Sequence, residues 1–341
     1  MRRSAWQVIG AFTLVSAVGR TVATIAPGGP ARARVPSADD GARVVAERRK
    51  GRVLDLTVRS PALGDDRHVR LLLPPGWARD ARRTWPALWL LHGPGGDHTS
   101  WTEHSDVLAL TAGDDMIVVL PEGGACAAYT DPWRPRRGGP PRWETFHVTE
   151  LLQILERGYR AGPARAVAGC SQGGRGALAY AARHRGAFRA VAAFSPPLDT
   201  LYRSASGLDA LDLLELTAAV ARVDWSGYWG DPEAQRGVWR RHNPFDMVTP
   251  LTGVRLHLTS GTGVPGPLDP LPHGAPDPVE ALVHTMTTLY AAKLQALGVP
   301  ATTRFHPGTH SWPYWSREFA LALPGLRKAL SPPPESSSRA A

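Results

Sequence analysis

The chain has 341 residues, of which 43% are hydrophobic and 20% are charged, and its formal net charge is +9. This composition supports a sizeable buried core and excludes a disordered polyelectrolyte, while a count of two cysteines excludes a disulfide scaffold and a four-cysteine metal site. The basic residues are nearly all arginine and carry no zinc-finger, RNP or helix-turn-helix signature, so we expect no nucleic-acid partner.

Residues 1–33 have the pattern of a signal peptide. Arg2 and Arg3 precede an uncharged, mostly apolar stretch over 5–19, and residues 31–33 (Ala-Arg-Ala) offer a cleavage site. The apolar stretch is too short to cross a bilayer as a helix. We therefore expect a secreted, extracellular protein, whose positive charge is compatible with peripheral association with an anionic cell envelope.

The rest of the chain is expected to hold one domain over 51–330. Residues 34–50, rich in Pro, Gly, Ala and charge, are expected to be a flexible entry, and 331–341 a disordered tail. Short apolar runs predict strands over Val53–Val58, His68–Leu73, Ala87–Leu91, Met116–Leu120, Ala164–Cys170, Arg189–Phe194, Val254–Ser260 and Ala301–His306. Longer patterns predict helices over Glu144–Arg157, Gln172–His184, Pro278–Leu297 and Tyr314–Leu330, the last broken near Pro324.

Strands that alternate with helices are typical of an α/β fold with a central, mostly parallel sheet flanked by helices. Active sites in such sheets lie beyond the carboxyl ends of the strands. Residues 198–250 fit no strand–helix unit, and we expect them to form a roof over the site.

The most specific motif is G-x-S-x-G over 169–173 (GCSQG), between a predicted strand and a predicted helix. This is the position of a nucleophile elbow, where a tight turn projects the serine oxygen from the edge of the sheet in an α/β-hydrolase fold. The sequence therefore predicts Ser171 as a nucleophile. The alternative is a glycine-rich turn in which the serine only caps the following helix and has no catalytic role.

A serine nucleophile needs a base and an orienting acid, which follow it in the order acid, then histidine. His310 lies after the last predicted strand and is our candidate base; His306, at the strand end, is the nearest rival. Asp269, Asp277 and Glu280 all follow the strand Val254–Ser260, and spacing alone does not choose among them.

Two main-chain N–H groups are expected to bind the oxyanion. One is that of Gln172, after the nucleophile. The other is expected in the loop over 92–96 (HGPGG), where Pro94 has no N–H and Gly95 is the nearest candidate.

The histidines His92, His98 and His104 recur every six residues near acidic side chains, but no metal-binding motif accompanies them. We therefore predict no metal and no cofactor. Cys126 and Cys170 are compatible with a disulfide in an oxidising compartment, although Cys170 lies within the elbow and is better explained as a small buried residue.

Several segments, in the same order, resemble a known family. They are 129–133 (YTDPW), 142–146 (RWETF), 149–151 (TEL), 169–174 (GCSQGG), 228–230 (YWG), 239–244 (WRRHNP) and 308–315 (GTHSWPYW). With these, the chain from Val53 to Trp315 resembles the antigen 85 mycolyltransferases and their actinobacterial esterase relatives, within the wider esterase D group.

The resemblance implies a Ser–His–Glu triad, in which Glu280 takes the place of the family's acid at the start of the helix between the last two strands. It also places His92, Trp101 and Trp312 in the substrate-binding region. The family's trehalose-binding loop begins Asp-Gly-Leu-Arg, whereas this chain has His-Gly-Pro-Gly, which removes the carboxylate and arginine expected to hold trehalose.

The sequence thus predicts a secreted serine esterase or acyltransferase that acts on an acyl ester or lipid substrate through an acyl-enzyme, with water or an alcohol or sugar as acceptor. Three alternatives stand beside it: a carbohydrate or feruloyl-type esterase, a metal hydrolase, and a catalytically silent protein that binds the cell envelope.

Overall fold

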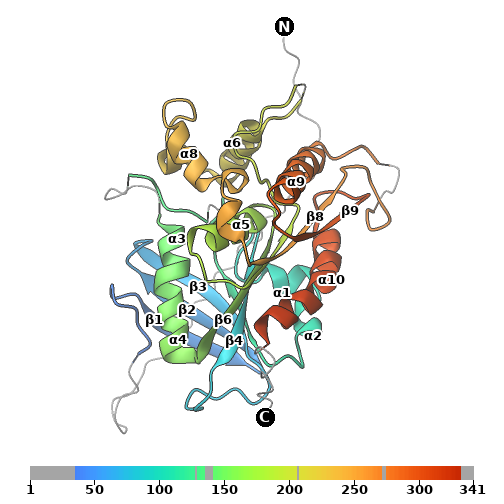
Figure 1. The fold of residues 1–341 in the computed structure, drawn as a ribbon. Coiled ribbons are helices and arrows are strands. Elements are labelled where there is room, and N and C mark those ends of the chain that lie inside the picture. Colours follow the sequence, from blue (N-terminus) through green and yellow to red (C-terminus); the bar gives the residue numbers. More distant parts are fainter. Residues whose placement is uncertain (1–34, 127–128, 135–140, 206, 271–273, 332–341) are drawn as a thin grey trace, which may run out of the picture. The chain divides into compact units, whose positions relative to one another are not determined.

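A computed structural model describes residues 35–126, 129–134, 141–205, 207–270 and 274–331. These residues form one nine-stranded sheet in the order β1-β2-β3-β5-β4-β6-β7-β8-β9 (Figure 1). Its strands are β1 (Arg43–Lys50), β2 (Val53–Ser60), β3 (Asp65–Leu72), β4 (Trp85–Leu91), β5 (Ile117–Pro121), β6 (Ala161–Cys170), β7 (Ala190–Phe194), β8 (Arg255–Gly261) and β9 (Ala301–His306). The six from β5 to β9 in the sheet order are parallel, and β1, β2 and β3 continue the sheet as antiparallel strands.

Helices connect the parallel strands. They are α1 (Ser100–His104), α2 (Val107–Leu110), α3 (Trp143–Thr145), α4 (Leu152–Tyr159), α5 (Gln172–Arg183), α6 (Ala210–Ala221), α7 (Ser226–Trp229), α8 (Arg236–His242), α9 (Pro278–Ala296) and α10 (Trp312–Leu330). A π-helical segment, Phe146–Leu151, joins α3 to α4, and two short 3₁₀ turns, Pro244–Asp246 and Thr249–Leu251, precede β8.

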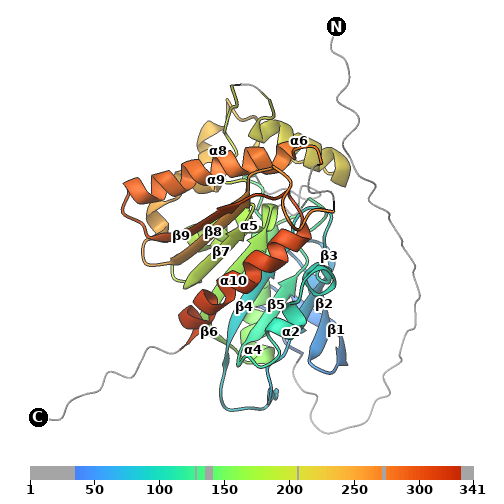
Figure 2. The ribbon, with the colours of Figure 1, turned by 90° about the vertical axis from the view of Figure 1, so that its right-hand side faces the viewer.

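Both faces of the central sheet are buried, which explains the nearly continuous apolar runs of its strands. In β4, Ala87, Trp89 and Leu91 pack into the core that contains α4 and α5, and Leu88 and Leu90 pack into the core that contains α10. Figure 2 shows α10 lying along one face of the sheet, on the same side as α2. The central β6 therefore ends between two layers of helices, with its carboxyl end free to present a side chain.

The mostly parallel α/β architecture is confirmed, and the eight predicted strands agree with the structure to within three residues at each end. The prediction of a flexible entry over 34–50 is wrong for its second half, because Arg43–Lys50 forms the edge strand β1. An edge strand has one neighbour and needs few buried side chains, so charged residues on its open side are compatible with pairing. The predicted signal peptide over 1–33 and most of the predicted tail lie outside the described residues.

Two helices also differ from the expectation. The helix predicted over Glu144–Arg157 contains the π-helical segment. The break predicted near Pro324 is absent, since α10 continues through that residue. Proline removes one helical hydrogen bond, but Leu323 and Leu326 on either side are buried against the sheet, and this packing holds the helix together.

Residues 198–250 contain α6, α7 and α8, which lie in Figure 1 beyond the carboxyl ends of the parallel strands. The apolar side of α6 packs on α9, where Ala210 and Leu213 meet Leu282, Val283 and Met286. This arrangement places the segment as a cover over the end of the sheet where the predicted nucleophile lies. Among the described helices, none is both long enough and apolar enough to cross a membrane.

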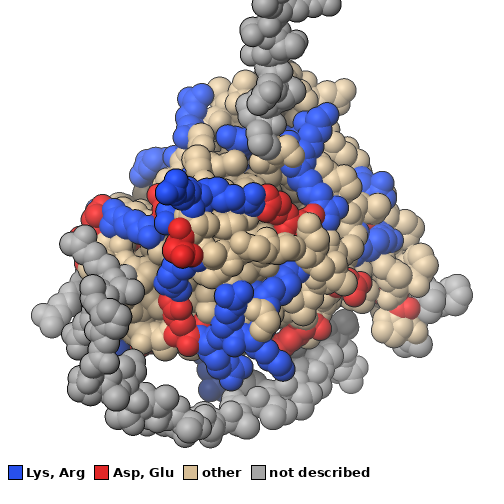
Figure 3. Space-filling view, turned by 90° about the horizontal axis from the view of Figure 1, so that it is seen from below, with Lys and Arg blue, Asp and Glu red and all other residues tan. Residues whose placement is uncertain are grey.

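Arginines contribute many ion pairs, such as Arg70 with Asp55 at 2.7 Å and Arg327 with Asp114 at 2.8 Å. On the face drawn in Figure 3, basic side chains are interspersed with acidic ones. The surplus of positive charge is therefore spread over mixed surface and does not form one continuous basic patch on that face.

Candidate active site

The turn between β6 and α5 holds Ser171 in a strained backbone conformation, with φ 52° and ψ −125°. This conformation is possible because the neighbouring glycines let the chain segments approach closely. A Cβ on Gly169 would lie 2.4 Å from the carbonyl carbon of Gly173, and a Cβ on Gly173 would lie 2.4 Å from the Leu91 carbonyl oxygen. The turn therefore has the strand–turn–helix geometry of a nucleophile elbow.

His310 lies in the loop between β9 and α10, and its ring reaches the serine. Its Nε2 is 2.9 Å from Ser171 Oγ, and its Nδ1 is 2.5 Å from Glu280 Oε2. Because a carboxylate only accepts hydrogen bonds, Nδ1 carries the proton, and Nε2 is left to accept the hydrogen of the serine hydroxyl. The Trp315 ring packs edge-on against the imidazole at 5.0 Å and limits its rotation.

Glu280, in the first turn of α9, is fully buried. Its Oε1 accepts hydrogen bonds from Ser195 Oγ at 2.7 Å and from the Gly261 N–H at 2.5 Å, while Oε2 faces His310. A buried carboxylate is costly unless such donors surround it. The acceptor geometry thus fixes both oxygens and aims one of them at the imidazole.

The two other acidic candidates lie near His310 without touching its ring. Asp277 accepts the main-chain N–H of His310 at 2.8 Å and caps α9. Asp269 binds the hydroxyls of Thr309 and Tyr314, the latter at 2.7 Å. Both carboxylates therefore shape the loop that carries the histidine, and Glu280 alone of the three meets the imidazole.

Of the two main-chain N–H groups expected to bind the oxyanion, one is available in the structure. Among the described residues, no acceptor bonds to the Gln172 N–H, which lies at the N-terminus of α5, where the helix dipole favours negative charge. Gly95 differs from the expectation, because its N–H already donates to the Ala125 carbonyl at 2.9 Å. The Gln172 N–H is therefore available beside Ser171, whereas the Gly95 N–H is already bonded to the neighbouring loop.

The three predicted substrate-binding residues have different positions. His92 and Trp101 are each 1% exposed, so the expectation that their side chains face substrate requires correction. Trp101 donates from Nε1 to the Leu91 carbonyl at 3.2 Å and packs edge-on against Trp312 at 5.2 Å. Trp312 is half-buried beside Trp315, which itself contacts the His310 ring, so Trp312 is the one of the three that borders the site.

Ser195 was not predicted as a site residue. It follows β7, the strand next to β6, and has φ 47°. Its hydroxyl accepts a hydrogen bond from Trp315 Nε1 at 3.0 Å and donates to Glu280. Its position directly after a short buried strand was the signal available in the sequence, because ends of neighbouring parallel strands meet at one edge of the sheet.

A narrow apolar pocket opens beside Gln172, under the segment formed by α6 and α7. It is lined by Cys126, Thr130, Gln172, Arg175, Leu214, Trp225, Tyr228 and Trp229. Three of these residues are aromatic and one is aliphatic, and this part of the wall suits the apolar part of a small ligand.

Cys126 and Cys170 are both free thiols. The histidines His92, His98 and His104 do not converge, since the His98 ring lies tilted against His68 and the His104 ring lies beside Trp312. Within the described ranges, no group of three or more potential ligands is placed to hold a metal ion.

Comparison with known proteins places this geometry in context. A family model described as "Putative esterase" matches residues 60–326. Esterase Rv1288 of Mycobacterium tuberculosis is 32% identical over 285 residues, which cover 80% of this chain and 58% of that protein. The chain thus spans little more than half the length of that relative. Diacylglycerol acyltransferase/mycolyltransferase Ag85A of Mycobacterium leprae is 29% identical over 292 residues, covering 82% of this chain and 84% of that protein.

Solved structures share the fold. A ferulic acid esterase has a TM-score of 0.57 and 25% identity, covering 81% of this chain and 97% of that one. MPT51 (FbpC1) of Mycobacterium tuberculosis has a TM-score of 0.64 and 23% identity, covering 81% of this chain and 98% of that one. These similarities confirm the expected α/β-hydrolase fold and the resemblance to the antigen 85 group.

Proposed function

We propose, from the premise that this chain belongs to the "Putative esterase" family, that it cleaves acyl esters with Ser171 as nucleophile, His310 as base and Glu280 as the orienting acid. The observation that carries the proposal is the continuous hydrogen-bonded series from Ser171 Oγ through the His310 ring to Glu280, with separations of 2.9 Å and 2.5 Å. This is the arrangement that serine acyl chemistry needs.

In the first half of the reaction, Ser171 Oγ forms a bond to the ester carbonyl carbon while its proton passes to His310 Nε2. The carbonyl π electrons move to the oxygen, which becomes an oxyanion near the Gln172 N–H. Glu280 stabilises the imidazolium that results. Collapse of the intermediate breaks the bond between the carbonyl carbon and the leaving alcohol oxygen, which takes the proton from Nε2.

In the second half, an acceptor hydroxyl repeats these steps on the acyl-enzyme. Water yields the free acid, whereas an alcohol or a sugar yields a new ester. The aromatic and aliphatic pocket beside Gln172 is placed to hold the acyl side of the substrate. Leu214 of α6 contributes to this wall, so the cover formed by 198–250 takes part in substrate binding in this proposal.

A direct test is labelling with a fluorophosphonate, followed by mapping of the modified peptide and assay of p-nitrophenyl esters. We expect the label on Ser171 and the loss of turnover in Ser171→Ala. Equal turnover in that variant would exclude the serine as nucleophile, and a protein that neither labels nor turns over any ester would favour the silent envelope-binding alternative.

A feruloyl-type activity is the second candidate, favoured by the aromatic pocket wall of Trp225, Tyr228 and Trp229 and by the likeness to a ferulic acid esterase. A panel of p-nitrophenyl esters that share one leaving group and differ in the acyl group separates the two. Faster acylation by hydroxycinnamoyl than by aliphatic acyl groups would establish the second candidate.

We also propose that the protein is exported, on the basic, apolar and small-residue order of residues 1–33. Expression of the full chain in an actinobacterial host, followed by N-terminal sequencing of the extracellular protein, tests this. A start near residue 34 supports cleavage, and retention of the intact chain in the cytoplasm contradicts it.

A further inference from the structure

The loop after β4 runs directly beside the nucleophile. A Cβ added to Gly93 would lie 3.3 Å from Ser171 Cβ, so this glycine is in close contact with the serine. The next main-chain nitrogens along the loop belong to Pro94, Gly95 and Gly96. These nitrogens are therefore the natural source of a second oxyanion donor.

His92 fixes the orientation of this loop from inside. Its Nε2 accepts the Gly123 N–H at 2.8 Å, so its Nδ1 carries the hydrogen and donates to the Gly93 carbonyl at 2.7 Å. Burial lowers the pKa of His92 and keeps the ring neutral, as this pair of bonds requires. The Gly93 carbonyl also accepts the Gly96 N–H at 3.2 Å. The peptide between Gly93 and Pro94 is thus held on its oxygen side by two donors.

Two N–H groups of this loop are already committed, that of Gly95 to the Ala125 carbonyl and that of Gly96 to the Gly93 carbonyl. The Gly93 N–H lies on the side of the buried Cys170 thiol, whose pKa it influences. Pro94 has no N–H. Gln172 therefore remains as the donor at the site.

The position of Pro94 is the decisive one. In a trans peptide the carbonyl oxygen and the substituent on the next nitrogen point in opposite directions, and the described chain has no cis peptide bond. Since the Gly93 oxygen points to His92 and Gly96, the group pointing the other way is the ring carbon of Pro94. A residue with an N–H at this position would direct a hydrogen to that side of the loop.

We infer that the oxyanion hole has, among the described residues, a single main-chain donor, the Gln172 N–H, and that the enzyme consequently acts on activated acyl donors such as aryl esters and thioesters. The inference rests on the proposed function. One oxyanion donor changes kcat by about 10²–10³, so both halves of the reaction are slowed. An aryl ester or thioester still acylates Ser171 because its leaving group departs easily. The serine ester that forms is an ordinary alkyl ester, so its hydrolysis is slow and the acyl-enzyme accumulates.

The test uses three butyryl substrates that differ only in the leaving group: p-nitrophenyl butyrate, S-ethyl thiobutyrate and ethyl butyrate. We expect a rapid burst of one p-nitrophenol per Ser171, followed by slow turnover, and a kcat/KM for ethyl butyrate about 10³-fold or more below that for the aryl ester. A steady rate without a burst, or ethyl butyrate as good a substrate as the activated esters, would overturn the inference.

Pro94→Ala supplies the missing N–H. We expect it to raise both the rate after the burst and kcat/KM for ethyl butyrate by about tenfold or more. A folded variant with unchanged or lower rates on both would contradict the single-donor hole. Pro94→Gly is the second variant, should alanine disturb the loop. If turnover of every substrate is absent, or persists in Ser171→Ala, the proposed function fails; Ser171-dependent turnover without a burst removes this inference alone.

Discussion

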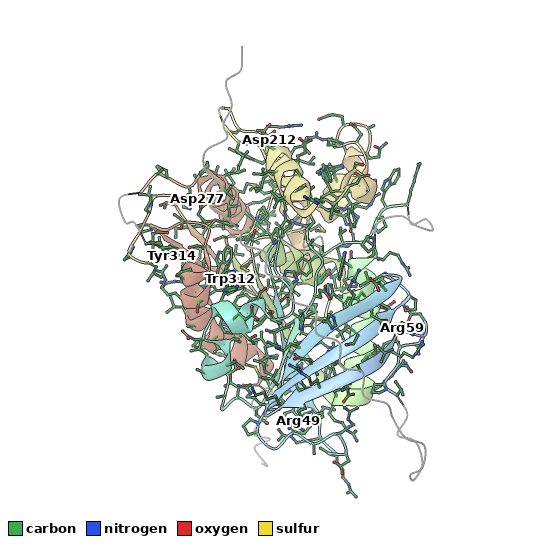
Figure 4. The ribbon with its side chains drawn as sticks, turned by 180° about the vertical axis from the view of Figure 1, so that it is seen from behind. Arg49, Arg59, Asp212, Asp277, Trp312 and Tyr314 are labelled. Carbon is green, nitrogen blue, oxygen red and sulfur yellow. The ribbon has the colours of Figure 1, made fainter. Side chains whose placement is uncertain are left out.

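Asp277 accepts the main-chain N–H of His310 with one carboxylate oxygen at 2.8 Å, and with the other it caps the helix that carries Glu280. The cap bonds come from the N–H groups of Val279 at 2.9 Å and Glu280 at 3.1 Å. One side chain thus fixes the backbone of His310 relative to that of Glu280. Figure 4 labels Asp277 at the start of α9, on the same side of the molecule as Trp312 and Tyr314 at the start of α10.

This link predicts that Asp277→Ala lowers kcat about tenfold with little change in KM, because a loss of alignment near the reacting atoms weakens catalysis more than binding. It should also cost about 1 kcal/mol in the free energy of unfolding, as the loss of a helix cap does. Asp231→Ala is a matched control, since Asp231 accepts two main-chain N–H groups in an exposed turn. Full kcat in the Asp277 variant would show that the link does not align the site.

Glu280→Gln tests the orienting acid. The amide oxygen can still accept from Ser195 and Gly261, but the amide nitrogen would face His310 and favour the wrong tautomer. We expect kcat to fall by about 10³–10⁴, the effect of such a change in other triads. Asp269→Asn, a second carboxylate in the same region, should cost far less. The reverse order of these two effects would reassign the acid.

Ser195 bonds to both Glu280 and Trp315, and the Trp315 ring packs against His310. Removing its hydroxyl leaves Trp315 Nε1 without its acceptor and Glu280 without one donor. We expect Ser195→Ala to lower the free energy of unfolding by about 1–3 kcal/mol, the cost of an unsatisfied buried group, and to lower kcat several-fold. Ser195→Gly relieves the strain of φ 47° but also lacks the hydroxyl. Equal kcat losses in both variants identify the hydroxyl as the cause, and an active glycine variant would assign the effect to the backbone.

The sequence was sufficient for eight of the nine strands and, by motif and chain order, for two of the three residues in the hydrogen-bonded series. Buried parallel strands are continuous apolar runs, and the chain order of the elbow and the late loop pointed to Ser171 and His310. Spacing did not choose the acid, because Asp269, Asp277 and Glu280 all follow β8, and the choice of Glu280 came from the family resemblance. In the structure all three carboxylates bond to residues of the loop that carries His310.

Other features depended on contacts between segments far apart in the chain. Ser195 meets Glu280 across 85 positions, a pairing set by the order of β7 and β8 in the sheet. The commitment of the Gly95 N–H depends on the path of the loop after β5, which no local pattern specifies. The edge strand β1 was missed because its charged composition is also typical of an irregular segment.

The final prediction concerns acid stability and rests on His147. Its ring is fully buried in the helix after β5, where Nε2 donates to the Glu122 carbonyl at 2.8 Å and Nδ1 accepts from Tyr180 Oη at 2.8 Å. Burial lowers the pKa of His147 to about 3. Its pKa in the unfolded chain is about 6.5, so between these values the unfolded state binds a proton that the folded state does not.

Stability from this group is therefore present above pH 6.5 and is lost as the pH falls toward 3. The difference at pH 5 corresponds to about 2 kcal/mol. Urea unfolding at pH 7, 6 and 5 should show a steep fall for the wild type and a shallower one for His147→Gln, whose amide does not titrate in this range. His104→Gln, on an exposed part of α1, should leave most of the slope in place. A slope as steep in His147→Gln as in the wild type would mean that other buried groups, such as His242 with its pKa of about 3, govern the acid transition.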